Sequence, residues 1–442
     1  MRLQILDPDA RFACGSCTFC CDQPWHTYIE KDKAVALDNA DFGAYPQLAG
    51  KRFYHKSSQA DDGFHILAKG EGTRCLFLDT DGLCIIHKEL GPEAKPAMCR
   101  QFPYLPSATQ VDDRISVNFG CPAVQNQKGP PLSAQHAEVA AIIPRRDKPP
   151  NPKARVRLDT NTLISLTESD ALFKRAIALF GDDGDGSIWD RFARLLSTLV
   201  AASRFKQEHP GGALDAIVRD GGDLPGMPRL RPITRYAQPS RAPSPARLLF
   251  AATIFRDTVP RDKVQKGLGF LSRLTLLPKL MSLAKLSGTY ASLLLDRNVT
   301  IPQVLAHRLG EDLDAPATQM LLRYYRSRFW QRLLAGTRLT IVAGVHQHIQ
   351  DLNAILYFAR AAAHAEGADR LTEALVKKGL TCVEFHFANQ SRAFDQKLIG
   401  WFQAQLENPA VALQSLRLMA LKSPQPDTAT ETGAGATTHA PV

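Results

Sequence analysis

The sequence predicts a mainly α-helical protein whose helical domain follows a small, irregular, cysteine-rich module with a short β-hairpin. Two observations lead to this fold class. Beyond residue 158 apolar residues recur at helical spacing over long stretches, whereas the first 125 residues lack a helical period and hold eight of the nine cysteines. The 442 residues are 44% apolar and 22% charged, which excludes wholesale disorder and allows about two to three domains.

Changes in composition divide the chain into four segments. Residues 1–125 form the cysteine-rich metal-binding module, in which turn formers separate short apolar runs. Residues 126–157 form a linker, because prolines and basic residues concentrated within it disfavour regular structure. Residues 158–422 form the helical domain, which a Pro- and Arg-rich loop interrupts at 208–246. Residues 423–442 are poor in large apolar side chains, so we expect a disordered tail.

Two helices are expected between residues 158 and 207, on either side of an acidic, glycine-containing loop at 181–186. An EF-hand register set on the Asp-Gly pair of this loop would place Gly181 at position one and Phe192 at position twelve. A calcium loop needs Asp and Glu there. We therefore interpret the loop as a turn between helices.

The charge balance offers few clues to a partner. A net charge of +10 favours acidic partners, but it is equally typical of a solvated basic surface. The basic, aromatic segment 321–330 presents its apolar residues on one helical face, which favours a core helix over a nucleic-acid contact. No apolar stretch reaches the roughly 20 residues of a membrane span. We expect neither nucleic-acid binding nor a membrane span.

The clustering of the cysteines is the strongest functional signal. The N-terminus has no apolar segment of an export signal, so we expect a cytoplasmic protein in a reducing compartment. Clustered cysteines in that setting are typical of metal sites. The candidate metal ligands are Cys14, Cys17, Cys20, Cys21, Cys75, Cys84, Cys99 and Cys121. The ninth cysteine, Cys382, is interpreted as a buried, small apolar residue.

The first motif runs from Cys14 to Cys21 and places thiolates two residues apart in a tight loop. Thiolates are the soft ligands that zinc and iron–sulfur clusters prefer. Together with the remote Cys121-Pro122 pair, the first three thiols match the spacing of a bacterial ferredoxin run. The side chains of the adjacent Cys20 and Cys21 are expected to diverge, so one of them is a spare thiol or serves a second site.

Two further motifs carry three more thiols. Asp81-Gly82 is a hairpin signal that would bring Cys75 and Cys84 together on paired strands. His87 could add a ligand, but an ordinary polar position on the following turn is the favoured interpretation. Cys99 is followed by Arg100, which either favours the thiolate or lies on the surface beside a structural cysteine.

These motifs resemble the YkgJ-type cysteine-cluster family of zinc- or iron-chelating domains. The family pattern is an N-terminal CxxCxxCC, then C-x-F-L-D…G-x-C, then R-P-x-x-C-R-x-F-P. The matching runs are residues 14–21, 75–84 and 95–103, with Lys95 in place of the more usual Arg. The resemblance covers about a quarter of the chain.

Within that family, the run from Cys84 to Gly91 and the later Cys121-Pro122 are most similar to the flagellin lysine-N-methylase (FliB-like) branch, from which His87 departs. The resemblance implies an iron–sulfur cluster, 4Fe-4S in the first instance, or zinc, held by the cysteines. In the methylase branch it also implies methyl transfer from S-adenosylmethionine to a lysine of a protein such as flagellin. The sequence lacks the glycine-rich fingerprint of a Rossmann-type cofactor site. A non-catalytic zinc- or iron-binding adaptor is therefore the alternative hypothesis.

Other residues with metal-binding or catalytic chemistry are weaker candidates. His346 and His348 lie two positions apart on a predicted helix, where their directions differ by about 200°, so a shared metal is not expected. Glu384 and His386 have no neighbouring nucleophile and are assigned no catalytic role.

Overall fold

The computed structural model describes residues 3–23, 25–56, 63–143, 149, 151–181, 186–220, 244–255, 257, 278–292, 295–306, 313–332, 339–386 and 399–418. Most of the acidic loop, the proline cluster of the predicted linker and most of the Pro- and Arg-rich loop lie outside these residues. The whole predicted tail, 423–442, also lies outside them.

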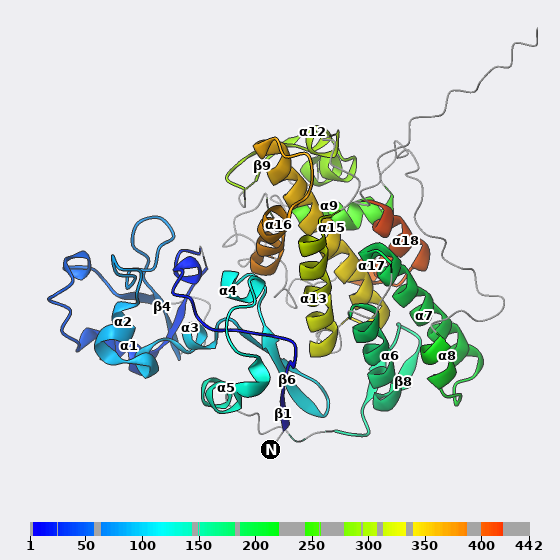
Figure 1. Ribbon diagram of the computed structural model, residues 1–442, viewed down its shortest axis with the longest axis horizontal. Coiled ribbons are helices and arrows are strands. Elements are labelled where there is room, and N and C mark those ends of the chain that lie inside the picture. Colours follow the sequence, from blue (N-terminus) through cyan, green and yellow to red (C-terminus); the bar gives the residue numbers. More distant parts are fainter. Residues whose placement is uncertain are drawn as a thin grey trace, which may run out of the picture.

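The fold is mainly helical, as predicted, with a few short strands (Figure 1). The described α-helices are α1 (Lys31–Asp38), α2 (Ile85–Leu90), α3 (Ala97–Gln101), α4 (Pro122–Gln125), α5 (His136–Ile142), α6 (Leu166–Leu179), α7 (Ile188–Glu208), α8 (Asp215–Asp220), α9 (Pro245–Phe255), α12 (Ile301–Ala306), α13 (Ala315–Gln331), α15 (Ile341–Glu366), α16 (Glu373–His386), α17 (Ile399–Leu406) and α18 (Pro409–Leu418). The strands are β1 (Leu3–Leu6), β2 (Tyr28–Glu30), β3 (Tyr54–Lys56), β4 (Phe64–Leu67), β5 (Tyr104–Ala108), β6 (Asp112–Val117), β7 (Arg155–Arg157), β8 (Leu163–Ser165), β9 (Thr289–Ser292) and β10 (Arg297–Thr300). Short 3-10 turns include η1 (Phe19–Cys21).

The N-terminal strand ties the cysteine-rich region to the rest of the protein. β1 pairs in parallel with β6, and β6 pairs antiparallel with β5, giving the order β1-β6-β5. The chain leaves this sheet after β1 and returns at β5. Between these points it forms a second sheet, β2-β4-β3, together with α1, α2 and α3.

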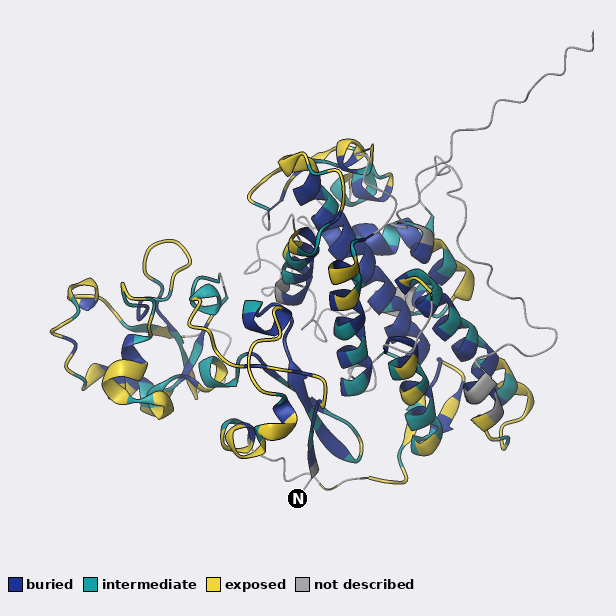
Figure 2. Ribbon diagram, in the orientation of Figure 1, coloured by how far each residue is buried: buried dark blue, intermediate teal, exposed yellow. Residues whose placement is uncertain are grey.

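Two main groups of buried apolar residues hold the structure together. The larger group joins the β1-β6-β5 sheet to the helices, and Figure 2 shows buried residues concentrated in the helical body. The smaller group belongs to the part of the chain between β1 and β5. We call it the module core; it consists of Ile29, Ala34, Leu37, Phe42, Leu48, Leu67, Ala68, Leu76, Phe77, Ile85 and Ile86.

Four of the described helices begin at a side chain that accepts a hydrogen bond from one of their free amide groups. Ser165 and Ser187 each form a capping box at the start of α6 and α7. The two helices predicted between residues 158 and 207 are therefore confirmed. Asp314 caps α13 and Thr340 caps α15. The aromatic face predicted to be a core face is buried, since Tyr325 and Phe329 have no exposed surface.

The short strands that follow the cysteine-rich region were not predicted. β7 and β8 form one hairpin, and β9 and β10 form another. Each strand has three or four residues, which is too short for an alternating pattern to be distinguished from a helix end.

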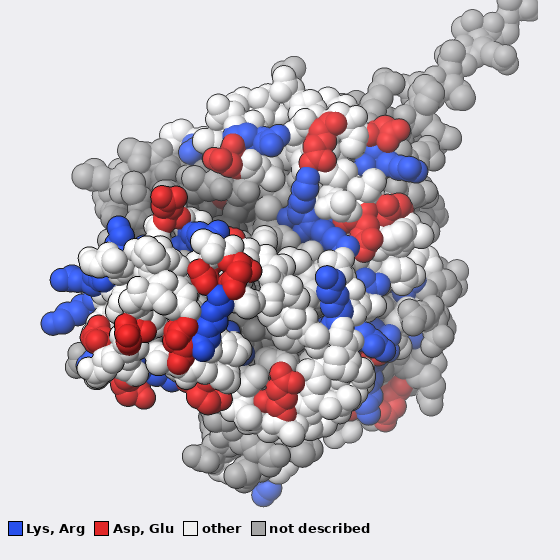
Figure 3. Space-filling view, turned by 60° about the vertical axis from the view of Figure 1, so that its left-hand side comes forward, with Lys and Arg blue, Asp and Glu red and all other residues white. Residues whose placement is uncertain are grey.

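The described helices include none that is long and apolar enough to cross a membrane. On the face shown in Figure 3, Lys and Arg side chains are interspersed with Asp and Glu. This face therefore agrees with the interpretation of a solvated surface of mixed charge.

A buried polar network fixes α15 against α17 and α18. The two ring nitrogens of His346 lie 3.0 Å from Leu406 O and 2.8 Å from Ser415 Oγ. Asn353 donates a 2.9 Å hydrogen bond to Ser415 O. Burial lowers the pKa of His346 from 6.5 to about 4, because the charged imidazole loses its hydration.

We expect this histidine to make folding sensitive to acid. Between pH about 6.5 and about 4 the unfolded chain binds a proton that the folded protein excludes. The free energy of unfolding is therefore unaffected by this group above pH 6.5. It decreases as the pH falls towards 4, by about 3 kcal/mol in total. Urea unfolding across this pH range gives the slope of the free energy of unfolding against pH, for the unchanged protein and for His346→Gln. The unchanged protein is expected to have the steeper slope. Identical slopes would contradict the prediction.

Candidate metal centre

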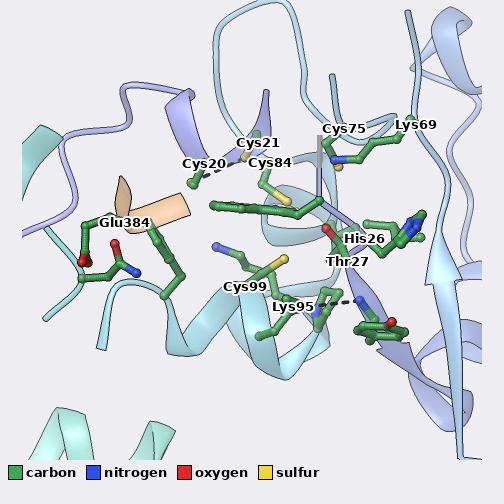
Figure 4. A pocket seen from close by; sticks show the side chains of 18 residues that line it. Cys20, Cys21, His26, Thr27, Lys69, Cys75, Cys84, Lys95, Cys99 and Glu384 are labelled. Atoms are coloured by element: carbon green, nitrogen blue, oxygen red, sulfur yellow. Dashed lines mark hydrogen bonds between the residues drawn. The ribbon is translucent and has the colours of Figure 1, made fainter. Parts of the chain in front are cut away.

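Five of the eight candidate thiols line one cavity of about 290 Å³ (Figure 4). We call it the thiol cavity. Cys20 and Cys21 belong to η1, Cys84 is the residue before α2, and Cys99 lies in α3. Cys75 lies between β4 and α2. The three motifs, which span 80 residues of sequence from Cys20 to Cys99, therefore converge at one place.

Backbone hydrogen bonds explain how Cys21 and Cys75 meet. Thr18 adopts a left-handed conformation with φ of 60°, which turns the chain into η1. The carbonyl of Cys21 then accepts a 2.8 Å hydrogen bond from the amide of Cys75. The CxxCxxCC loop is thus pinned to the second motif by its backbone.

The predicted hairpin between Cys75 and Cys84 is only partly correct. The turn at Asp81-Gly82 exists, and Gly82 has φ of 80°, which favours glycine. However, Cys84 forms a single bridge with Leu78, whereas Cys75 forms one with Lys69. The prediction of Cys75 and Cys84 on paired strands is wrong because the chain bends between Cys75 and Leu78, where a 3.1 Å hydrogen bond closes a turn.

The prediction that Cys20 and Cys21 diverge is also wrong. The tight turn of η1 directs both side chains to the thiol cavity, with their sulfur atoms 4.0 Å apart. The hydrogen bond with Cys20 is the main cause that lowers the pKa of Cys21 to about 7, with support from Lys95 and Lys69. The same hydrogen bond raises the pKa of Cys20. One sulfur of this pair is therefore prepared to be a thiolate.

The other cavity thiols are held in their neutral form. Burial raises the pKa of Cys75 to about 11 and that of Cys99 to about 12, and it also raises the pKa of Cys84. The proximity of these thiols to one another contributes in the same direction. A bound cation would reverse this preference, because it stabilises thiolates.

The remaining three candidate thiols lie apart from the cavity. Cys14 and Cys17 are exposed, and Cys121 is buried at the residue before α4. Burial is the main cause that raises the pKa of Cys121, and the nearby Cys17 and Cys14 add to it. These three form a separate outer group. Cys20 lies between the two sets, because both Cys99 and Cys14 contribute to raising its pKa.

The other walls of the thiol cavity are largely apolar and aromatic. Trp25 and Phe102 lie with ring centroids 5.6 Å apart. Met98 accepts a 3.1 Å hydrogen bond at its sulfur from the amide of Tyr28. Lys69 and Lys95 bring positive charge to the lining, so the site combines soft donors with groups that offset thiolate charge.

Glu384, which sequence reasoning assigned no role, reaches this cavity from α16 (Figure 4). Its carboxylate pairs with Arg328 and accepts hydrogen bonds from Tyr324 Oη at 2.9 Å and from the amide of Phe119 at 3.2 Å. The carboxylate therefore joins α13 and α16 to the segment just before Cys121. No local signal could have indicated this, since 265 residues separate Glu384 from Phe119.

Several weaker candidates do not belong to the site. His87 is exposed and is not part of the cavity lining. Arg100 pairs with Glu93 and is not part of the cavity lining. The His346 and His348 rings have different partners, since His348 pairs with Asp351. These two histidines do not share a site.

Cys382 is 9% exposed and packs in the helical core. We predict that Cys382→Ala leaves the metal content unchanged and lowers stability by only about 1 kcal/mol, the transfer free energy of a small buried group. Metal analysis and urea unfolding test both parts. Loss of metal from this variant would show that Cys382 has a role at the centre.

The five cavity thiols suit a metal centre that prefers sulfur ligands, although their sulfur atoms do not surround a single ion position. Among the described residues no three His, Cys, Asp or Glu side chains are close enough together to hold an ion as they stand. Five soft donors nevertheless face one space beside two lysines, and soft thiolates select zinc, copper(I) and iron–sulfur clusters.

Comparison with known proteins supports metal binding by this region. Residues 13–122 match the family model described as "CxxCxxCC: Putative zinc- or iron-chelating domain". The matched segment includes all eight candidate thiols. No curated protein and no solved structure matches the chain. The cysteine-rich region is therefore similar to zinc- or iron-chelating domains, over about a quarter of the chain.

Proposed function

We propose that the thiol cavity holds an iron–sulfur cluster of the 4Fe-4S type. The observation that carries this proposal is the space that the thiols share. A structural zinc ion takes four ligands in a closed tetrahedron and leaves no cavity between them. A cavity of about 290 Å³ bordered by five thiols suits a larger cofactor. The ligands come from Cys20, Cys21, Cys75, Cys84 and Cys99, of which a cluster needs four.

The outer group of Cys14, Cys17 and Cys121 is proposed to serve a second centre, with Cys20 available as its fourth ligand. Support comes from the location of these thiols away from the cavity and near one another. Two sets of four would use all eight candidate ligands.

We further propose that the protein is a lysine N-methyltransferase that uses S-adenosylmethionine, with a protein such as flagellin as substrate. The resemblance to the flagellin lysine-N-methylase branch suggests this activity. The space beside the thiols supports it, because aromatic and apolar walls can receive a second ligand. The transfer would move a methyl group from the sulfonium sulfur to a neutral lysine amine, leaving S-adenosylhomocysteine and releasing a proton to solvent.

Anaerobic purification of the full chain tests the cluster. Iron and acid-labile sulfide, together with a broad visible absorption band, are expected. Zinc without sulfide, even after anaerobic reconstitution, would contradict the cluster and favour a non-catalytic zinc- or iron-binding adaptor.

Equilibrium dialysis of the reconstituted protein with labelled S-adenosylmethionine tests the methylase proposal separately. Saturable binding that requires the cluster is expected, followed by label transfer to a lysine-containing protein. A loaded cluster without binding would contradict methyl transfer while leaving the cluster assignment intact. Cys382→Ala is the control variant, because Cys382 lies outside both the thiol cavity and the outer group. It is expected to bind S-adenosylmethionine as the unchanged protein does.

A further inference from the structure

A second cavity, of about 410 Å³, shares no lining residue with the thiol cavity. It lies where the turn of the β5–β6 hairpin meets β7, the start of α6 and the end of α13. Figure 1 shows the end of α13 between this hairpin and α6. Its polar lining comprises Thr109, Gln110, Arg155, Arg157, Ser169 and Arg332. We call it the arginine cavity.

A buried cation forms part of its lining. Arg332 is 8% exposed and ends α13 in a left-handed conformation with φ of 52°. One nitrogen of its guanidinium pairs with Asp170, but Nε is buried without a hydrogen-bond partner among the residues that the structure describes. The group lies over the ring of Phe173, 5.6 Å from the centroid. Burial is the main cause that lowers the pKa of Arg332 to about 10, and the nearby Arg114 adds to it, whereas Asp112 acts in the opposite direction.

Two further cations stand at the rim. Arg155 and Arg157 are exposed and, two positions apart on β7, point to the same side of the strand. Neither pairs with a carboxylate of the described residues.

Three carboxylates on the elements that border this cavity have cationic partners among the described residues. Asp112 pairs with Arg114, with a nitrogen–oxygen distance of 3.3 Å. Glu168 pairs with Lys206 at 2.6 Å, and Asp170 pairs with Arg332. The two rim arginines therefore leave an excess of positive charge.

We infer that the arginine cavity binds the phosphate groups of a phosphorylated small molecule. Guanidinium groups match phosphate oxygens in a bidentate manner. The two rim arginines supply the excess charge, and the buried Nε of Arg332 is a further donor. Ser169 adds a hydroxyl group to the lining of the same cavity. A nucleic-acid backbone would meet the exposed rim arginines, but the 8% exposure of Arg332 restricts access by a duplex.

Isothermal titration of the full chain with inorganic pyrophosphate tests this inference. We expect saturable binding with one site per chain. The double variant Arg155→Gln/Arg157→Gln removes both rim charges, which form no ion pair within the described part of the chain. Its Kd is expected to rise about tenfold or more, because each charge-assisted contact is lost.

The matched control is Arg52→Gln/Arg370→Gln, which removes two exposed arginines outside the cavity lining. Its Kd is expected to stay within about twofold, since a change in net charge alone is screened by salt. Equal weakening in both double variants, or no saturable binding, would overturn the inference. Displacement of bound pyrophosphate by adenosine, which carries no phosphate, would also overturn it.

Discussion

Cys84→Ser is expected to remove the metal centre of the thiol cavity and to unfold the module core. The thiol of Cys84 lines the cavity, and Cys84 directly precedes α2. The first two residues of α2 are buried in the module core. The module core is small, so much of its stability is expected to come from the ligands. Bound structural metal can contribute about 10–16 kcal/mol of apparent free energy to a small domain. Loss of one ligand should therefore have a large effect.

Metal analysis combined with hydrogen exchange measures this outcome. Amides of α1, β4 and α2 are expected to lose protection in Cys84→Ser, whereas amides of α15 should keep it. The control is Cys14→Ser, because Cys14 is exposed and lies outside the cavity. It should keep the protection of the module core. Full metal content and full protection in Cys84→Ser would refute the assignment of this thiol.

Arg328→Met is expected to destabilise the protein by about 3–5 kcal/mol, because it leaves a buried carboxylate without its counter-charge. The side chain of Arg328 is 3% exposed and that of Glu384 is fully buried. Arg328 also lies over the ring of Tyr324, 5.1 Å from its centroid. Little solvent is present to replace the lost partner.

The double variant Arg328→Met/Glu384→Gln separates this charge effect from packing. The amide introduced by Glu384→Gln is neutral, and its one carbonyl oxygen can replace one of the two carboxylate oxygens that accept from Tyr324 and Phe119, so part of the lost stability should return. Urea unfolding followed by circular dichroism gives the free energies of unfolding. A single variant within about 1 kcal/mol of the unchanged protein, or a double variant as unstable as the single one, would argue against a buried charge pair.

Sequence reasoning predicts most accurately those features that depend on neighbouring residues. The helices α6 and α7 follow from apolar spacing, and the burial of Cys382 follows from its apolar neighbours. The convergence of distant cysteine motifs could be expected from their chemistry. Which thiols face the cavity could not, because the division depends on the bend after Cys75 and on the position of Cys121 in the larger core.

Features built by distant contacts left no pattern in the sequence. Glu384 reaches the thiol cavity only because α13 and α16 pack beside the segment preceding Cys121. The arginine cavity likewise joins Arg155 and Arg157 to Arg332, which follows them by more than 170 positions. Each of these residues resembles an ordinary polar surface residue when only its sequence neighbours are considered.

The parallel pairing of β1 with β6 has a consequence for the loss and recovery of the metal centre. All five cavity thiols lie on a stretch of about 100 residues whose two ends are held in one sheet, by β1 and by β5. For a flexible loop of this length, bringing the ends together costs about 4 kcal/mol of chain entropy. As long as the β1-β6-β5 sheet stays folded, the ends remain together and refolding of the module does not include this cost. A module that opens after metal loss therefore remains a tethered loop rather than a free tail. Its thiols stay at high local concentration, so recovery of the folded module is expected to be an intramolecular search within a confined volume.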